Sequence, residues 1–204
     1  MDVSVTEMNP VALRLLTKAL TSPMESWSFG LALLRSSYYR VKYEWGLKRA
    51  RFGKRFRVYG VIKIKGPGQV IFGDDVVCAG TVTPYTHAPG ACIMVGDGTF
   101  LNGTRFGAAK LISVGPECIL ADCRIMDTDF HSLHRNRHER DAPVATREVR
   151  IGPNVWVGAQ AAVLKGVTIG ENSVVGFGAV VTSDIPPNVV AAGNPARVIG
   201  PIPE

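Results

Sequence analysis

The chain has 204 residues, of which 46% are hydrophobic and 20% are charged, a balance typical of a folded globular protein and unlike that of a disordered chain. No run of about 18 uncharged apolar residues is present, and no basic segment precedes an apolar core at the N-terminus, so we expect neither a spanning helix nor a signal peptide. The 4 cysteines have no CxxC spacing, which favours reduced, mostly buried thiols over disulfides or a metal site.

Positive charge is concentrated in the first 60 residues. They hold 11 Lys and Arg against 4 Asp and Glu, a net charge of +7, whereas residues 61–204 hold 12 against 13, a net charge of −1. The basic residues are densest in residues 35–57. Such a local segment fits a membrane surface, an acidic partner, an anionic ligand or a solvated face, and it does not favour a nucleic-acid partner.

Two helices are predicted in residues 1–50. The first starts at Asn9-Pro10 and carries one apolar face, formed by Leu13, Leu16 and Leu20. The second starts at Ser22-Pro23, where a capping box precedes a run that reaches Trp45, and Gly46 provides the stop. Their amphipathic pattern suits packing on the rest of the protein or contact with a membrane surface.

A six-residue period begins further along the chain. From Ile151 an aliphatic residue recurs at every sixth position, namely Ile151, Val157, Val163, Ile169, Val175 and Val181. Earlier stretches keep the period at Phe72 and Cys78, at Val95 and Leu101, and at Val114, Leu120 and Met126. Small or β-branched residues fill the space beside the corners, as at Val76, Val155, Thr168 and Ala179.

This period fits neither a helix nor simple strand alternation. It predicts a mainly β fold, a triangular parallel β-helix with three short strands in each coil of about 18 residues. Glycine or asparagine is expected at the corners, where φ is positive or two backbones approach closely. Six successive hexads in register favour this solenoid over ordinary short strands joined by glycine turns.

One interval interrupts the repeat. Residues 127–150 contain no glycine and three of the 4 histidines, His131, His134 and His138, and we expect a loop that leaves one coil. The predicted organisation is a basic, partly helical extension over residues 1–60, a solenoid over 61–200 with this excursion, and a tail over 201–204. His87, which lies between Pro84 and Pro89, is read as a turn histidine.

The segment from Val149 to Ile199, with its ending VVAAGNPARVIG, resembles the hexapeptide-repeat acyltransferases. The resemblance covers about residues 65–200 and is closest to the galactoside, maltose and polysaccharide O-acetyltransferase branch. It implies a left-handed parallel β-helix, a homotrimer with sites between subunits, and acetyl-CoA as the donor. The acceptor it implies is a sugar hydroxyl, on a small molecule or on a lipid-linked or polysaccharide precursor.

The same resemblance implies site residues. ADCRIMDTDFH ends at His131, in the place of the family's catalytic base, and VGDGTFLN ends at Asn102, in the place of an asparagine that meets the acceptor. Trp156 matches a tryptophan that walls the site. The implied CoA channel follows Ala159, Phe177, Gly178, Ala179, Thr182, Ser183 and Arg197.

Two departures from the family pattern affect the ligands. Ser183 replaces a lysine that often meets a CoA phosphate, which leaves that contact to Arg197 or to another chain. Lys110 falls near the place of an acidic acceptor contact in the galactoside enzymes, which argues against a galactoside acceptor.

The chemistry of acetyl transfer requires few groups. A hydroxyl needs a base to take its proton as it attacks the thioester, and a histidine titrates near working pH. A backbone N–H can stabilise the oxyanion, and neither a covalent intermediate nor a metal is expected. Asp127, Asp129 or a backbone carbonyl can orient the imidazole of His131, and Asp129 is also a candidate acceptor contact. His134 and His138 are surface or acceptor-contact residues.

Three alternatives remain open. An amino-sugar N-acetyltransferase shares the same helix, and a non-catalytic β-helix scaffold lacks the chemistry. A γ-type carbonic anhydrase needs three histidines on adjacent coils, but Ala159-Gln160 stands where one of them belongs. We expect a cytoplasmic protein, and residues 35–57 suit peripheral contact with the inner face of a membrane.

Overall fold

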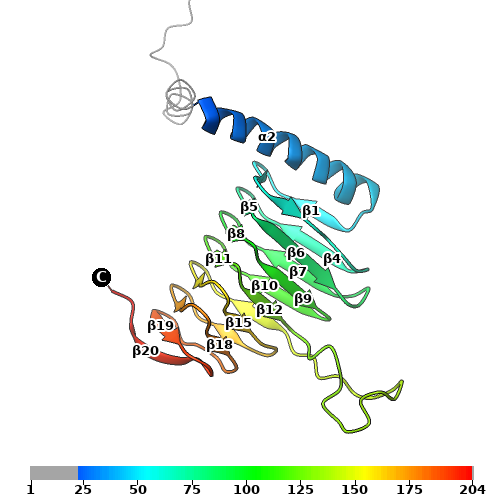
Figure 1. The fold of residues 1–204 in the computed structure, drawn as a ribbon, viewed down its shortest axis with the longest axis vertical. Coiled ribbons are helices and arrows are strands. Elements are labelled where there is room, and N and C mark those ends of the chain that lie inside the picture. The colour runs from blue at the N-terminus through cyan, green and yellow to red at the C-terminus, as the bar shows by residue number, and fades with distance from the viewer. Residues whose placement is uncertain (1–22, 204) are drawn as a thin grey trace, which may run out of the picture.

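The computed structural model of the protein describes residues 23–203. They form a parallel β-solenoid of about 7 turns with one N-terminal helix (Figure 1). The mainly β solenoid predicted from the six-residue period is therefore confirmed.

Three sheets form the faces of the solenoid. The first contains, in spatial order, β1 (Ala50–Phe52), β4 (Gln69–Phe72), β7 (Cys92–Val95), β10 (Leu111–Val114), β13 (Val149–Ile151) and β16 (Thr168–Ile169). The second contains β2 (Arg57–Val58), β5 (Val77–Ala79), β8 (Phe100–Asn102), β11 (Ile119–Ala121), β14 (Trp156–Val157), β17 (Val174–Val175), β19 (Val189–Ala192) and β20 (Arg197–Pro201). The third contains β3 (Val61–Ile62), β6 (Thr81–Thr86), β9 (Arg105–Ala108), β12 (Arg124–Met126), β15 (Ala162–Val163) and β18 (Val180–Val181).

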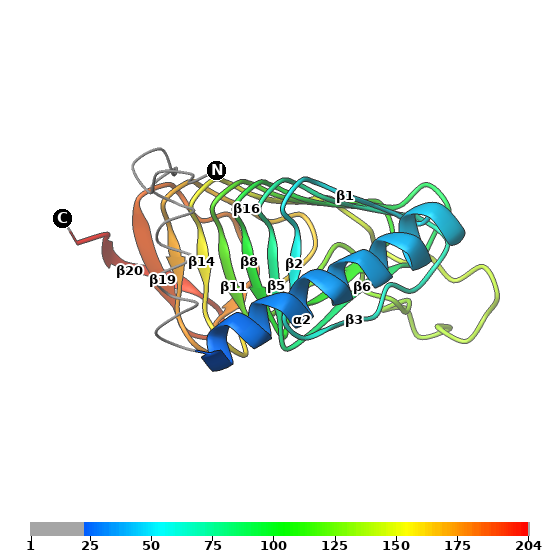
Figure 2. The ribbon, with the colours of Figure 1, turned by 90° about the horizontal axis from the view of Figure 1, so that it is seen from above.

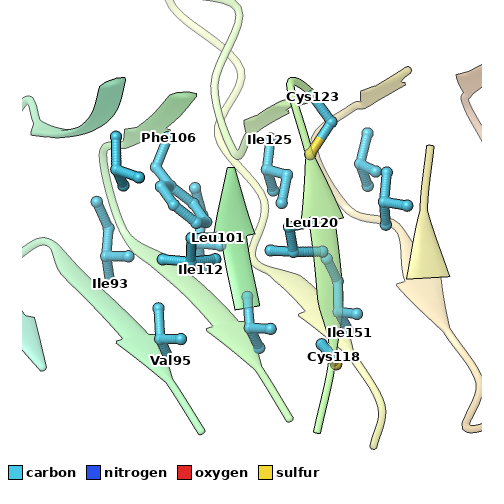
Figure 3. Close-up of a cluster of buried hydrophobic side chains, with 14 of the residues drawn as sticks. Ile93, Val95, Leu101, Phe106, Ile112, Cys118, Leu120, Cys123, Ile125 and Ile151 are labelled. Carbon is cyan, nitrogen blue, oxygen red and sulfur yellow. The ribbon is translucent and has the colours of Figure 1, made fainter. Parts of the chain in front are cut away.

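The aliphatic residues of the repeat fill the centre of the coils. From Ile151 to Val181 each of the six is at most 4% exposed, and Figure 3 shows side chains such as Ile93, Leu101 and Ile112 turned into the same interior. Two expected inward positions are wrong. Met126 is only half-buried and Thr168 is exposed, whereas Ile125 and Val167 are buried in their place. Strand alternation decides which of two neighbours points inward.

Stacked asparagines shape one corner of the coils. Asn154, Asn172 and Asn188 have φ angles of 52°, 57° and 60°, and asparagine tolerates this left-handed conformation better than most residues. The side-chain amide of Asn154 donates to Oδ1 of Asn172, and that of Asn172 donates to Oδ1 of Asn188, both over 3.0 Å. The corner positions expected for asparagine are thus joined from coil to coil.

The helical segment lies across the N-terminal end of the solenoid (Figure 2). It comprises α2 (Pro23–Tyr39) and the π-helix η2 (Arg40–Gly46), which confirms the predicted stop at Gly46. Tyr39 and Tyr43 are buried, and Tyr39 Oη accepts a hydrogen bond from the backbone N–H of Ile62. The helix predicted near Asn9 and the cap at Ser22 lie outside the described residues. The first coil already begins at Ala50, earlier than the expected boundary at residue 60.

The expected excursion leaves the solenoid between β12 and β13 and projects from its side (Figure 1). Its two ends are held together, because the Arg147 N–H donates to the Asp127 carbonyl over 2.9 Å and Thr128 bridges Thr146. The strands on either side keep their register, with Ile112 paired to Val149. The loop is therefore inserted without disturbing the stack.

All four thiols are free, and Cys78, Cys118 and Cys123 are buried, as expected, whereas Cys92 is half-buried. Burial raises the pKa of the Cys123 thiol to about 12, so it stays protonated. Within residues 23–203 no helix has the length and apolar character needed to cross a membrane.

Candidate functional site

A cleft of about 670 Å³ lies between the excursion and the third sheet. Outward-facing residues of β6, β9 and β12 form its floor: Tyr85, Arg105, Gly107, Arg124 and Met126. Residues of the excursion form its wall: Thr128, Phe130, His131, Val144 and Thr146. The loop thus brings His131 over a sheet whose own residues are fixed by the stacked strands.

His131 enters the cleft from a tightly turned backbone. Its N–H donates to the Asp129 carbonyl over 2.7 Å, and Phe130 before it has a φ of 61°. The Phe130 ring reaches down to β9, where Gly107 leaves room for it: a Cβ at Gly107 would lie 2.5 Å from Cζ of Phe130. The absence of a side chain at Gly107 therefore lets the loop sit close to the sheet.

His87 lines the same cleft, so reading it only as a turn histidine is incomplete. Its ring lies 4.0 Å from the Tyr85 ring and 4.7 Å from the Phe130 ring, centroid to centroid. Partial burial lowers the pKa of His87, although the charge of Asp127 opposes this, so the imidazole is neutral at neutral pH. Sequence reasoning missed this position because it depends on the pairing of β6 with β9, where Thr86 is the Cα partner of Ala108, and on the fold of the excursion that carries Phe130.

The two aspartates beside His131 have different surroundings. Asp127 is fully buried, and its carboxylate accepts the backbone N–H groups of Ala109, Lys110 and Leu111 over 2.7, 2.7 and 2.8 Å. Its oxygens hold the turn between β9 and β10, so the hydrogen bonds of Asp127 go to backbone groups and not to the imidazole of His131. Asp129 Oδ1 pairs with Lys165 Nζ over 2.6 Å, and Asp129 Oδ2 is buried without a hydrogen-bond partner.

Sequence reasoning also missed two arginines on the floor of the cleft. Arg105 and Arg124 are Cα partners on β9 and β12, and both are exposed. Both also border a smaller hollow of about 310 Å³ at the adjacent corner, together with Asp122, Cys123 and Gln160. No sequence motif marks them: each is the first residue of its strand in the structure, and the two strands lie in successive coils.

The predicted acceptor contacts are not gathered in this cleft. Asn102 ends β8 and Trp156 begins β14, both on the second sheet, and Trp156 is 49% exposed. His134 is exposed on the excursion. None of the three lines the cleft of His131 within one chain.

The predicted CoA contacts lie on the coils after the excursion. Gly178 N–H donates to the Ala159 carbonyl over 2.9 Å, so these residues share a corner, and Phe177 beside them is 70% exposed. The Ala179 side chain is fully buried, which leaves only its backbone for a ligand. Three exposed residues follow towards the C-terminus: Thr182, Ser183 and Arg197.

In the described part of the chain, no three His, Cys, Asp or Glu side chains are grouped closely enough to hold a metal ion. The three histidines of the excursion thus form no such group within one chain.

Comparison with known proteins identifies the repeat. The family model of the bacterial transferase hexapeptide (six repeats) matches residues 148–183. Galactoside O-acetyltransferase of Escherichia coli is 41% identical over 88 residues, which cover 43% of this chain and 43% of that enzyme. Residues 148–183 thus carry the transferase hexapeptide repeat, and the chain is similar to the hexapeptide-repeat acyltransferases. The family resemblance seen in the sequence is thereby confirmed, although the chain spans less than half the length of this relative.

Two solved structures of this family are similar over most of the chain. The polysialic acid O-acetyltransferase OatWY is 27% identical, with a TM-score of 0.62 over 74% of each chain. The hexapeptide-repeat acetyltransferase VCA0836 of Vibrio cholerae, in complex with acetyl-CoA, has a TM-score of 0.57 over 95% of this chain and 86% of that chain. At 22% identity, this second similarity concerns the fold alone.

Proposed function

We propose that this hexapeptide-repeat protein is an acyltransferase that moves the acetyl group of acetyl-CoA directly to a saccharide hydroxyl, with His131 as general base. The observation that carries the proposal is the position of His131 in a cleft between the excursion and the third sheet, next to the coils that match the transferase hexapeptide. The titration range of histidine suits a base near neutral pH.

The proposed reaction has a single transfer step. The acceptor oxygen attacks the carbonyl carbon of the thioester while its proton passes to the imidazole of His131. The C–S bond then breaks, and the CoA sulfur leaves as a thiol with the proton from His131. Backbone N–H groups near the cleft stabilise the oxyanion in between.

The proposed donor site follows the corner of Ala159 and Phe177 towards Arg197. The acetyl-CoA in the VCA0836 structure and the activity in the names of the relatives support this donor. Because Ser183 replaces the usual lysine, Arg197 supplies the positive charge that meets a CoA phosphate. Lys110 argues against a galactoside acceptor, and the relative OatWY acts on polysialic acid.

A homotrimer completes the proposed site. The second sheet presents an outward column of Phe100, Ile119 and Trp156, which are 36%, 46% and 49% exposed and stand in register on β8, β11 and β14. A contiguous exposed apolar column of this kind is typical of a surface that another subunit covers. Contact through this sheet would bring Asn102 of one subunit near the His131 cleft of the next. Light scattering measures the mass of the assembly, and we expect the mass of three chains.

Mixed trimers of His131→Ala and Arg197→Ala test whether sites are shared between subunits. They regain part of the activity if residues from two chains form one site, and no rescue contradicts shared sites.

The decisive experiment measures acetyl-CoA-dependent release of free thiol over a panel of neutral sugars, acidic sugars, amino sugars and serine. We expect turnover with a hydroxyl acceptor that is lost in His131→Ala and retained in Asp141→Asn, a control at an exposed position of the same excursion. Turnover confined to the amine of an amino sugar identifies an N-acetyltransferase instead. Absence of CoA binding refutes the proposal and favours the non-catalytic scaffold.

We further propose that the outer face of α2 and η2 contacts an anionic lipid surface. While one face of this segment packs on the first coil, the opposite face exposes a stripe at helical spacing: Trp27, Leu31, Leu34, Tyr38, Val41 and Trp45. Arg35, Lys42 and Lys48 are exposed beside the stripe. Aromatic residues with flanking basic residues are typical of helices that lie in the headgroup region.

Vesicle co-sedimentation tests this contact. Binding to vesicles of phosphatidylcholine with phosphatidylglycerol is expected to fall in the double variant Trp27→Ser and Trp45→Ser. Leu133→Ser, which removes another exposed apolar side chain on the excursion, is the control and is expected to bind normally. Equal binding by both variants contradicts the proposal. A change of molecular mass in the double variant, without a change in vesicle binding, assigns the stripe to a second copy of the chain.

A further inference from the structure

Arg105 and Arg124 place two positive charges side by side on the floor of the cleft. They are Cα partners on adjacent strands, which lie about 4.8 Å apart in the hydrogen-bonding direction. Like charges directly opposite each other on neighbouring strands are destabilising. Because both side chains are exposed, solvent screens their repulsion, and an anion bound by both guanidinium groups would remove it.

No carboxylate of the described residues forms an ion pair with either arginine. Among residues 23–203, neither guanidinium forms an ion pair or a side-chain hydrogen bond. Asp122 borders the neighbouring hollow with both arginines but lies beyond ion-pair distance of either. The aspartates nearest the base are already engaged, Asp127 by backbone N–H groups and Asp129 by Lys165.

The position of the pair favours the acceptor over the donor. For transfer to occur, the thioester of the donor must lie against His131. Its phosphates are then at the far end of the pantetheine arm, towards Thr182 and Arg197. Arg105 and Arg124 line the same cleft as His131, so they meet the molecule that receives the acyl group.

We propose that Arg105 and Arg124 form an anion site that binds a carboxylate or phosphate group of the acceptor and holds a neighbouring hydroxyl against His131. The acceptor is thus an acidic saccharide, not a neutral one, an inference that rests on the proposed acyl transfer. Arginine suits this task because its planar guanidinium forms two parallel hydrogen bonds to a carboxylate or phosphate and remains charged at any relevant pH.

The cleft also explains how the acceptor would be oriented. Tyr85 lies on the strand next to that of Arg105, and its ring lies 4.0 Å from the His87 ring, centroid to centroid, at a tilt of 38°. A sugar ring with its anionic group on the arginines can lie over these aromatic faces. The charged end and the ring are then fixed separately, so a single hydroxyl faces His131.

Binding without turnover tests the site independently of catalysis. Calorimetric titrations use the full chain with glucuronate, glucose 6-phosphate and glucose, in the absence of acetyl-CoA. We expect the acidic sugars to bind and glucose to bind much more weakly. Arg105→Gln and Arg124→Gln are each expected to lower the affinity for the acidic sugar by about tenfold or more, the usual size of a lost charge-assisted contact. Preference for glucuronate or for the phosphate identifies which anion the site accepts.

Three controls keep the test decisive. Arg150→Gln removes an exposed arginine on β13 of the first sheet and is expected to bind acidic sugars normally. His131→Ala is expected to lose turnover but keep anion binding, so failure of the proposed reaction and failure of the anion site give different results. Equal affinity of wild type and both arginine variants for acidic sugars overturns the anion site. Selective loss of CoA binding in these variants overturns it as well, because it assigns the arginines to the donor.

Discussion

Replacing Asp127 with asparagine tests whether this buried carboxylate is structural or acts on the base. Its Oδ1 accepts the Ala109 N–H, and its Oδ2 accepts the N–H groups of Lys110 and Leu111, over 2.7 to 2.8 Å. In its better orientation, asparagine keeps its oxygen near the Oδ2 position and turns its NH₂ group towards the Ala109 N–H. One charge-assisted hydrogen bond is lost, and a buried donor is left without a partner.

The expected cost in the free energy of unfolding is about 2–4 kcal/mol. For a chain of this size such a loss lowers Tm by roughly 5–15 °C. Circular dichroism during heating measures Tm, with Asp141→Asn on the exposed part of the excursion as the control. A Tm equal to that of the control, together with reduced kcat and an altered pH profile, would refute the structural role and show that Asp127 acts on His131.

Three further predictions follow from the cleft and the core. Gly107→Ala displaces the ring of Phe130, the residue before His131, so we expect the rate of thiol release to fall severalfold. Gly90→Ala, where the added methyl group meets no atom within 4 Å, is the control and is expected to have no effect. Equal rates for the two variants would contradict the packing argument. Because burial lowers the pKa of His87, the unfolded chain binds its proton more readily, so stability falls slightly as pH drops through about 6.5. Thermal scans from pH 7.5 to 5 reveal this slope, which His87→Asn reduces; an unchanged slope excludes His87 as its source. Leu120→Ala empties a fully buried position and costs about 2–5 kcal/mol in urea denaturation, whereas exposed Leu133→Ala costs little; similar costs would contradict the core assignment.

The sequence predicts the fold well because each coil repeats one local requirement. An inward aliphatic residue at every sixth position is visible without knowing which strands pair, and Ile151 and Val157 are buried as expected. The break in this pattern also locates the excursion. Where two adjacent residues are both apolar, as at Ile125 and Met126, the period does not show which one points inward, and the strand alternation decides.

The candidate site is less accessible from sequence because it depends on register between coils. Arg105 and Arg124 are separated by a full coil, and their contact with one cleft follows from strand pairing and from the fold of the excursion. His87 is a further example, since its partner Phe130 belongs to the loop. The role of Asp127 depends on three backbone N–H groups that belong to a turn one coil earlier, which no side-chain motif records.

The two ends of the solenoid differ from its interior, and this has a consequence for solubility. A stack of parallel coils ends in unpaired strand edges, to which another stack can add and grow into a fibre. Here α2 crosses the first coil, and β20 pairs with β19 in the opposite, antiparallel direction. Neither α2 nor β20 offers a parallel strand to which a further coil could pair, although β20 covers only the second of the three sheets. These two elements thus oppose the addition of further coils, and loss of either is expected to favour end-to-end polymerisation.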